Sequence, residues 1–534
     1  MTRRRTLMGV ETEYAVSGVA RKGDLEPANL FTDLIADVKQ RHAHVADSYN
    51  GLYLGNGARF YLDCASHPEY ATPECPAPRE VLAHIRAGER IVATAASAAH
   101  ARHRDLTEVN VFRSNVDYRN GTTWGCHESY LHRTDPTTLP PMLIPHLVSR
   151  LIFTGAGGFN PRSPGLEFTL SPRAWMLECA ISGNSTSTRG IFHTKNETLS
   201  SDGYHRLHLL CGESLCSDLS ILLKLGTTAL IVACIDAGWR VGEGLELKDP
   251  VAAMRAFAAD PGCRVRVPLL SGQLISAITL QHQYLQRVEE CRAQNLLPEW
   301  ADEICQMWAA TLDALEHNPR WAERRLDWSI KRCLYEHWAG GPVEWTALSR
   351  WSRIWVRINA RFERALKGLP APITRPALDT LLGEESPVPQ DVAFLTRFLS
   401  TIGRDWNGVR QFLQRRQEMF EIDLRFGQLG ERGIHTQLLA QGGLRPALVD
   451  DAEIERALTQ PPSSGRASVR GALVTQAHAS GNGAAYACDW TRILNRMDNR
   501  WVDLRDPFDP VVQWQPADHA SVRQAVRHTL DIFF

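Results

Sequence analysis

The sequence predicts an α+β fold in which a large, mostly antiparallel sheet forms a cradle covered by helices. Up to about residue 235, short strand-like runs such as TLMGVETEYAV and ARFYLDC alternate with helical stretches such as PREVLAHIRAGERIVATAASAAH. From about residue 247 to 338, segments such as QHQYLQRVEECRAQNL carry apolar residues three and four apart, as helices with one buried face do. We therefore expect the sheet from the first part of the chain and a helical layer from the next.

The chain has 534 residues, which is long enough for a large core and more than one domain. We expect a catalytic domain over residues 1–440 and a small C-terminal domain over residues 441–534. Residues from about 340 to 418 read as an inserted helical module, because WTALSRWSRIWVRINARFERALKG is followed by the proline-dense PAPITRPALDTLLGEESPVPQ.

Charge and cysteine content restrict the partners and the compartment. The formal net charge is −1, so the overall balance gives no reason to expect a nucleic acid or a membrane surface as partner. No apolar run approaches the roughly 20 helical residues that a bilayer requires. Twelve cysteines without a CxxC pair are typical of reduced thiols, so we expect a cytoplasmic protein without a disulfide framework or a zinc site.

Two of the expected strands carry polar side chains on one face. In NGARFYLDCASHPEYATPEC, Arg59, Tyr61 and Asp63 alternate with apolar residues, and successive side chains of a strand point to opposite faces. In MGVETEY, Glu11 and Glu13 share one face in the same way. Two acidic strands of this kind can line one cradle.

A single strand of this pattern could equally be the solvent side of a half-buried sheet. Two such strands side by side favour a site for a metal and a nucleotide, because Mg²⁺ takes oxygen ligands and usually binds both protein oxygens and nucleotide phosphates. His67, Glu69 and Thr72 follow at once and add further polar groups. A GxxxxGK[ST] loop is missing, and HESYLH is one residue too long for the zinc-protease HExxH, so both of those site types are excluded.

Motifs spread over nearly the whole chain resemble the ligases and deamidases of the prokaryotic ubiquitin-like protein Pup. The motifs are MGVETEY, NGARFYLDCASHPEYATPEC, SNVD with WGCHESYL, LVSRLIFTGAG, GYHRLHLLCGES with LLKLGTTALIV, QPPSSGRASVRG, CDW and RDPF. That family shares the carboxylate–amine ligase fold of glutamine synthetase. The resemblance therefore implies a glutamine synthetase-like sheet cradle covered by helices.

The resemblance also implies roles for individual residues. It implies that Asp63 is the catalytic base. The implied Mg²⁺ ligands are Glu11, Tyr61 and Glu69. The implied contacts to ATP are Arg59, Thr72 and Trp490, and further candidates in matching motifs are Arg189, Arg206 and His208. His127 and Glu128 also sit in a matching motif, as candidate contacts to phosphate or metal.

The reaction that the resemblance implies is an ATP- and Mg²⁺-dependent ligation. The side-chain carboxylate of the C-terminal Glu of a Pup-like modifier is phosphorylated and then joined to a lysine of a protein substrate by an isopeptide bond. The alternatives are a deamidase or isopeptidase acting on the same modifier, a related amide ligase acting on a peptide or small amine, and an inactive binding scaffold. The short connection from Val16 to Asn56 and Cys126 in GCHESYL favour the ligase.

The sequence departs from the family pattern in two places. Where the family usually has NTRDEPH, this chain has HTKNETL, so that Lys195 replaces an Arg and Asn196 replaces an Asp. A lysine offers phosphate a point charge where an arginine offers a bidentate contact. The inserted module is also absent from the family pattern. Both departures leave the identity of the modifier and of the acceptor amine open.

Overall fold

The computed structural model describes residues 5–20, 27–47, 51–63, 65–103, 106–118, 121–162, 166–195, 199–201, 203–341, 343 and 406–517. Its largest sheet has seven strands, each antiparallel to its neighbours, in the order β13-β8-β1-β6-β5-β4-β3. The strands are β13 (His205–Leu209), β8 (Cys126–His132), β1 (Met8–Glu13), β6 (Pro68–Ala71), β5 (Arg59–Leu62), β4 (Leu52–Leu54) and β3 (His44–Ala46). The predicted α+β class with a large antiparallel sheet is confirmed.

The strand-like run TLMGVETEYAV divides into two strands of different sheets. After β1, the run continues as β2 (Ala15–Ala20), which pairs with β7 (Leu106–Phe112). Tyr14 lies between them with its side chain 1% exposed, and its backbone N–H donates to the carbonyl oxygen of Pro68. The break therefore occurs where a buried aromatic side chain anchors the chain in the core.

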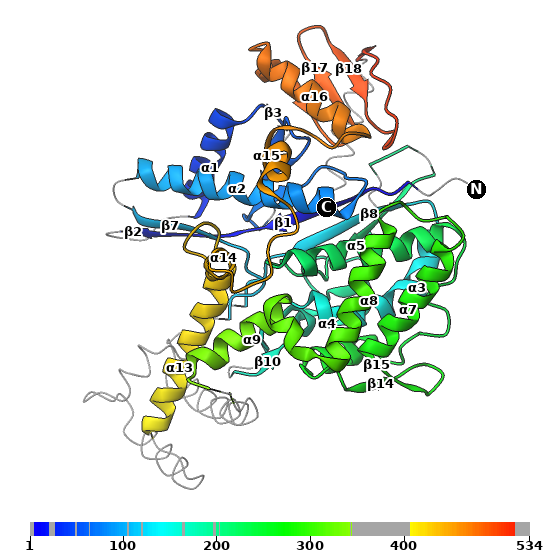
Figure 1. Cartoon of the computed structure of the whole chain (residues 1–534). Helices are drawn as coiled ribbons and strands as arrows, with labels where there is room; N and C mark the ends of the chain where they lie inside the picture. The colour runs from blue at the N-terminus through cyan, green and yellow to red at the C-terminus, as the bar shows by residue number, and fades with distance from the viewer. Residues whose placement is uncertain are drawn as a thin grey trace.

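Helices cover the apolar face of the central sheet (Figure 1). Beside β5 and β6 lie α1 (Pro27–Arg41) and α2 (Pro78–Arg102), and Ile91 of α2 shares a core with Phe60. Beside β8 lies α5 (Asp218–Asp236). The other helices of this half are α3 (Leu139–Ser149), α4 (Leu151–Thr154), α6 (Pro250–Ala258), α7 (Ala277–Arg292), α8 (Ala301–His317) and α9 (Asp327–Trp338). Because this face is covered, the opposite face of the sheet is left for polar side chains.

Short elements complete this half of the molecule. The remaining strands form two-stranded sheets: β9 (Gly158–Phe159) with β10 (Phe168–Thr169), β11 (Cys179–Ser182) with β12 (Gly190–His193), and β14 (Arg266–Pro268) with β15 (Leu274–Ser276). The 3-10 helices of this half are η1 (Pro136–Thr138), η2 (Arg173–Met176) and η3 (Pro319–Arg324), and a fourth, η4 (Gly483–Ala485), lies in the C-terminal part. The helical pattern from about 247 to 338 did not predict the β14–β15 hairpin.

The C-terminal part adds a second, smaller sheet. Its strands are β16 (Tyr486–Cys488), β17 (Arg492–Asn495), β18 (Arg500–Asp503) and β19 (Gln515–Pro516). The helices before it are α13 (Trp406–Phe426), α14 (Ile434–Ala440), α15 (Asp451–Thr459) and α16 (Arg466–Ala479). Its core also contains Val45 and Tyr53 from the central sheet, so the two sheets are packed together. The predicted boundary at residue 440 stays a prediction, and residues 344–405 of the predicted insertion lie outside the described residues.

One helix of the described chain, α5, is long and apolar enough to cross a membrane by length and composition. All of its apolar window is buried inside the protein, which is what a core helix of this composition shows. The cysteines that the structure describes are free thiols, most of them buried.

Candidate active site

Strand register brings the predicted site residues together on the polar face of the central sheet. Glu13 of β1 lies opposite Glu69 of β6, and Glu69 lies opposite Tyr61 of β5. Glu11 of β1 lies opposite His127 of β8. Directly opposed residues of an antiparallel pair point to the same face. Residues that are far apart in the sequence therefore form one surface of carboxylates, imidazole and phenol.

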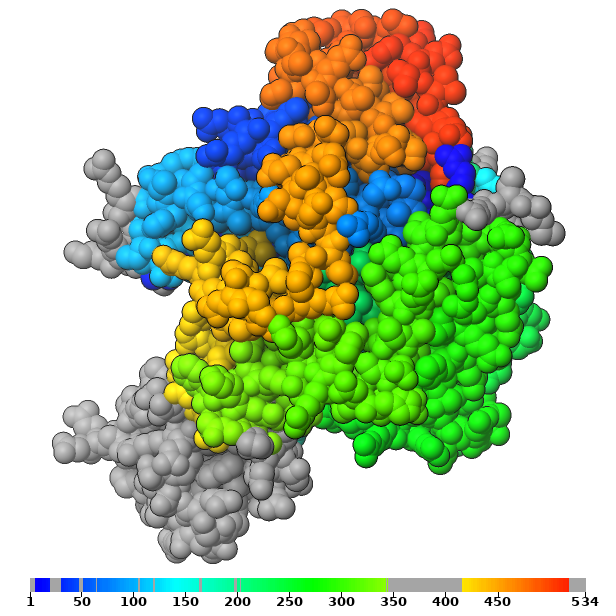
Figure 2. All heavy atoms as spheres, viewed as in Figure 1, coloured from blue at the N-terminus to red at the C-terminus, as the bar shows by residue number. Residues whose placement is uncertain are grey.

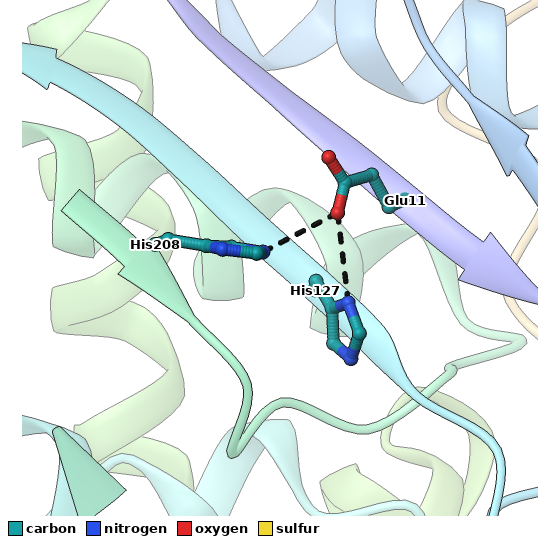
Figure 3. Close-up of side chains that lie close together, drawn as sticks. All are labelled: Glu11, His127 and His208. Carbon is teal, nitrogen blue, oxygen red and sulfur yellow. Dashed lines mark ion pairs between the residues drawn. The ribbon is translucent and has the colours of Figure 1, made fainter. Parts of the chain in front are cut away.

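Glu11 lies among the side chains of Arg206, His127 and His208, and Figure 3 shows the two imidazoles beside it. The Nη2 atom of Arg206 donates to its Oε1 atom at 2.7 Å. His208 Nε2 and His127 Nδ1 lie 3.3 and 3.5 Å from its Oε2 atom. Burial alone would raise the pKa of Glu11, but Arg206 and His208 hold it well below the usual range. Glu11 is therefore an ionised, oriented carboxylate.

Glu69 is the one carboxylate of this group that lacks a cationic neighbour at contact distance within the described residues. It is 4% exposed, and its Oε1 atom has no hydrogen-bond partner. Burial raises the pKa of Glu69 well above its usual range, and the nearby charges of Glu11 and Glu13 raise it further. A buried carboxylate beside two like charges is costly unless a cation joins them. The donor set fits Mg²⁺, which prefers oxygen ligands.

Tyr61 and Arg59 extend this face along β5. Burial raises the pKa of Tyr61 far above its usual range, and Glu69 and Glu11 raise it further, so its phenol is neutral. The guanidinium of Arg59 lies 3.9 Å from the centre of the Tyr61 ring. Arg59 also pairs with Asp47, with Nη2 and Oδ2 2.6 Å apart. Asp47 thus neutralises Arg59 and sets its orientation.

Asp63 follows β5 in a tight turn beside the polar face. Its Oδ1 atom accepts a 2.6 Å hydrogen bond from the backbone N–H of His67, and Ser66 within the turn has a left-handed φ of 66°. His67 Nδ1 lies 3.1 Å from Glu13 Oε2 and 3.5 Å from Asp63 Oδ2. Although burial would lower it, Asp63 and Glu13 raise the pKa of His67 to about 9. His67 therefore links the predicted base to the acidic strand β1.

A pocket beside Glu11 is lined by three of the residues predicted to contact ATP: Thr72, Trp490 and Arg206. Trp490 comes from the C-terminal part, and the guanidinium of Arg470 lies 4.7 Å from the centre of its ring. The Thr72 Oγ1 atom accepts a 3.0 Å hydrogen bond from the backbone N–H of Val10. An indole at one wall with Arg206 and Glu11 at another suits a ligand with an aromatic base and phosphates.

Some predicted residues lie elsewhere. Arg59, Arg189 and His208 do not line this pocket. Arg189 donates through Nη1 to Thr123 Oγ1 at 2.8 Å, and burial together with Arg173 lowers its pKa. Glu128 points to the opposite face of the sheet, where it is fully buried and pairs with Arg150 at 2.6 Å. Glu128 therefore has a structural role and no access to the site.

The sequence places Glu13 on the polar face but gives it no individual role. In the structure Glu13 bonds to His67 and also accepts a 2.8 Å hydrogen bond from the backbone N–H of Gly125. The alternation in MGVETEY was the available signal, because it places Glu13 on the same face as Glu11. Of the two residues that differ from the family motif NTRDEPH, Lys195 is described, and its backbone N–H donates to His193 Nδ1. Asn196 lies outside the described residues.

Comparison with known proteins decides the family. The sequence model of the family described as "Pup-ligase protein" matches residues 6–353 and 400–494, which is most of the chain. The chain belongs to the Pup-ligase family. The match leaves out residues 354–399, which fall within the predicted insertion.

Relatives within the Pup-ligase family match over almost their full length. The Pup–protein ligase of Acidimicrobium ferrooxidans is 30% identical over 513 residues, covering 94% of this chain and 96% of the relative. The Pup–protein ligase of Bifidobacterium longum is 29% identical over 527 residues, covering 94% and 91%. The predicted family resemblance is thus confirmed.

Two solved structures of Pup ligases share the fold. The complex between the prokaryotic ubiquitin-like protein Pup and its ligase PafA matches with a TM-score of 0.70 and 23% identity, covering 98% of this chain and 93% of that one. The Pup ligase PafA in complex with ADP matches with a TM-score of 0.65 and 24% identity, covering 95% of each chain. The roles of the individual site residues stay predictions.

Proposed function

We propose that this chain is an ATP- and Mg²⁺-dependent ligase that joins a Pup-like modifier to lysines of protein substrates. The observation that carries the proposal is Glu69, a buried carboxylate with an unpartnered oxygen beside Glu11 and Glu13. The adjacent pocket, lined by Trp490, Arg206 and Thr72, offers an indole, a guanidinium and a hydroxyl to a nucleotide. The names of the relatives support the same reaction, since they are Pup–protein ligases.

We propose that Glu11, Tyr61 and Glu69 hold Mg²⁺. They share one face of three adjacent strands, and Glu11 is already ionised and oriented by Arg206. Glu13 pairs with His67 and accepts a hydrogen bond from the Gly125 N–H. Its negative charge therefore lies beside the proposed cation site, although Glu13 is not one of the proposed ligands. When bound, Mg²⁺ neutralises phosphate charge, which favours attack of a carboxylate on the γ-phosphate.

The nucleotide is proposed to place its base against Trp490 and its phosphates toward Arg206. Trp490 contacts the Arg470 guanidinium, 4.7 Å from its ring centre, and the Tyr53 ring, 5.3 Å away between centres, so the indole is positioned before a ligand arrives. Preorganisation of this kind lowers the entropy cost of binding. Thr72 supplies a hydroxyl, and His208 adds an imidazole beside Glu11.

Asp63 is proposed to accept the proton of the attacking lysine. A lysine with a pKa near 10.4 is deprotonated in only about one molecule in a few thousand at pH 7, a deficit of roughly 4.6 kcal/mol. A positioned base typically contributes about 10²- to 10⁴-fold, which offsets much of that deficit. The amine nitrogen forms the bond to the activated carbonyl carbon, phosphate leaves, and the proton passes to Asp63. His67 holds Asp63 in place through its backbone N–H.

The reaction is proposed to occur in the cytoplasm. The described cysteines are free thiols, as expected in a reducing compartment. Neither the overall charge nor the polar face suggests a nucleic acid or a membrane as a partner. The partners that the proposal requires are the modifier and lysine-bearing proteins.

The test is conjugation with purified components. The chain is incubated with ATP, Mg²⁺, a Pup protein ending in Glu and a lysine-bearing protein. The expected product has the summed mass of modifier and acceptor less one water, with the bond at a lysine. Chelation of Mg²⁺, omission of ATP and acetylation of the acceptor lysines should each abolish it. Conjugation that persists without ATP would overturn the proposal.

A further inference from the structure

A lysine and a cysteine are in contact beneath the polar face of the central sheet. Lys224 of α5 donates to the thiol of Cys126 on β8, with Nζ and Sγ 3.2 Å apart, and to the backbone carbonyl of Glu213 at 2.9 Å. Both side chains are almost fully buried, with Lys224 2% and Cys126 5% exposed. Cys126 points away from Glu11, because it lies opposite the neighbouring residue of β1. The proposed reaction therefore uses neither group.

The contact lies inside the molecule, where α5 packs on β8. The helices α2 and α8 also pack on α5. In the view shared by Figures 1 and 2, the surface over β8 and α5 is formed by light-blue atoms near α2 and green atoms of the helical half. Large reagents are excluded from such a position. A molecule close to the size of water, such as hydrogen peroxide, reaches it through local opening of the structure.

The Lys224 nitrogen is not held in a salt bridge. Glu128, the buried carboxylate on the same face of β8, is occupied by Arg150, which donates to both of its oxygens at 2.6 and 2.8 Å. The Tyr130 hydroxyl donates to one of these oxygens at 2.6 Å. Within the part of the chain that the structure describes, Lys224 forms no ion pair. Its nitrogen can therefore react with the thiol without breaking one.

Oxidation of the Cys126 thiol would give this nitrogen an electrophile to attack. Hydrogen peroxide converts a thiol to a sulfenic acid, as its O–O bond breaks, one oxygen stays on sulfur and the other leaves as water. A sulfenic acid condenses with a neighbouring nucleophile, and with a nitrogen it gives a sulfenamide. Because Lys224 is held against Cys126, this second step is intramolecular and is favoured over reaction with dissolved thiols.

We propose that Cys126 and Lys224 form a peroxide-sensitive modification site, in which oxidation joins the two side chains by a sulfur–nitrogen bond. The ammonium first releases a proton to solvent. The nitrogen then bonds to sulfur, the S–O bond breaks, and water leaves with the hydroxyl oxygen and one amine proton. Sulfur is oxidised, and one peroxide is reduced to two waters. A dithiol reductant restores the thiol and the amine and is itself oxidised to a disulfide.

The bond would tie α5 to the strands that carry the proposed cation site. Cys126 lies opposite Thr12, which stands between Glu11 and Glu13 on β1. Closing a 3.2 Å contact to a covalent bond requires β8 or the Lys224 side chain to shift. We therefore expect the crosslinked chain to conjugate more slowly. This expectation about activity rests on the proposed function, whereas the bond itself does not.

The test is peroxide treatment of the purified full chain, followed by alkylation of free thiols, chymotryptic digestion and tandem mass spectrometry. The expected product joins the peptides of Cys126 and Lys224, with their summed mass less two hydrogens, and dithiothreitol removes it. The same treatment in urea should not produce it, because unfolding separates the two groups. In the folded chain the bond should form at least about tenfold faster than the thiol of Cys263 is oxidised.

Cys263 is the matched reference, because it is 7% exposed and therefore about as buried as Cys126. Burial and the nearby Asp260 raise the pKa of the Cys263 thiol to about 12. Cys263→Ser should leave the bond unaffected, and Cys126→Ser should abolish it. Lys224→Gln should leave Cys126 as a sulfenic acid that dimedone labels. Thermal melts check that the variants fold, and mapping of the unchanged chain gives a result even where a variant does not.

Three results would overturn the proposal. They are an oxidised Cys126 without a bond to Lys224, a disulfide between Cys126 and Cys211 in its place, and a Cys126 that stays reduced while Cys263 is oxidised. Conjugation by the unchanged chain should fall as the crosslink accumulates and return with dithiothreitol. If the crosslink forms and reverses but the reduced chain never conjugates, the ligase proposal fails and the modification site stands.

Discussion

Burying the carboxyl group of Glu69 costs the free protein stability, but the same group can bind a cation. Its neighbours on the polar face are Glu11 and Glu13, and burial denies all three full hydration. Glutamine at position 69 has nearly the same volume as glutamate but cannot ionise to supply a carboxylate ligand. It should therefore leave the fold intact and remove a ligand from the cation site.

We predict that Glu69→Gln lowers the affinity for Mg²⁺ and ATP together by at least about tenfold, because an amide is a poorer ligand for a hard cation. Isothermal titration calorimetry with and without Mg²⁺ measures this. Glu303→Gln, on the exposed first turn of α8, is the control and should bind as the unchanged chain does. An unaltered affinity in Glu69→Gln would show that Glu69 is only a core carboxylate.

Asp63→Asn should keep nucleotide binding but lower the rate of transfer to the amine by a factor of about 10² to 10⁴, since asparagine cannot accept the proton. The turn should survive, because the amide oxygen can still accept the hydrogen bond from the His67 backbone N–H. Single-turnover conjugation measures the loss, and calorimetry with ATP is the control. Transfer at the normal rate would remove Asp63 from the mechanism.

Alternation along two strands was sufficient to predict which side chains share the polar face. Glu11, Tyr61 and Asp63 all follow from that rule, because the strand period is two. The contact between His67 and Glu13 could not be predicted, since it joins residues 54 positions apart through a turn with a left-handed Ser66. Glu128 followed a family motif but obeys the same alternation, which places it on the buried face.

At the scale of elements, α16 is joined to the central sheet by a buried cluster of charges. Arg466 bonds to Glu74 at 2.6 Å, and Arg470 pairs with the other oxygen of Glu74. Arg470 also donates to the Gly57 carbonyl and lies over Trp490. The cluster thus fixes the wall that carries Trp490. Sequence alone gave no sign of it, because Glu74 and Arg470 are 396 positions apart.

The pKa of Glu74 makes this cluster sensitive to pH. Burial would raise that pKa, but Arg470 and Arg466 lower it to about 2 from a model-compound value of 4.5. A carboxyl whose pKa is lower in the folded state stabilises the fold above its unfolded pKa and stops doing so as pH falls through the folded pKa. A difference of this size corresponds to about 3 kcal/mol at pH 7.

We predict that Glu74→Gln lowers the free energy of unfolding of the C-terminal part by about 3 kcal/mol at pH 7, and that this deficit shrinks as pH falls from about 5 toward 2. Urea unfolding at several pH values measures it. Glu453→Gln breaks the more exposed pair with Arg79 and should cost less than about 1 kcal/mol. A deficit that does not change with pH would mean that packing, and not charge, holds α16.

At the scale of the whole molecule, the predicted fold class, a large antiparallel sheet covered by helices, matches the structure. Strand and helix periodicity predicted most elements, because each has one clearly buried face. The pairing order β13-β8-β1-β6-β5-β4-β3 was beyond that reasoning, since periodicity gives the faces of a strand and not its neighbours. The division of TLMGVETEYAV into β1 and β2 at Tyr14 was not predicted either, because periodicity does not show where a strand changes its neighbours.

The insertion is a further property of the whole chain. Residues 354–399 fall outside the match to the family, and their proline content suggests a separable segment. We predict that deleting them leaves ATP-dependent conjugation of the modifier intact and changes which acceptor proteins are used. Conjugation assays on a panel of acceptors measure this. Loss of folding on deletion would show instead that the segment completes the core.

The central claim is that the polar face of the sheet performs ligation and not hydrolysis. A ligase consumes one ATP for each bond, because the carboxylate oxygen leaves only after phosphorylation. The decisive measurement is the ratio of ADP released to isopeptide bonds formed, with a Glu-ended modifier and a lysine-bearing acceptor. We predict a ratio of one to one that is lost in Asp63→Asn. Cleavage of preformed conjugates or of a Gln-ended modifier without matching ADP release, and with no bond formed, would contradict the claim.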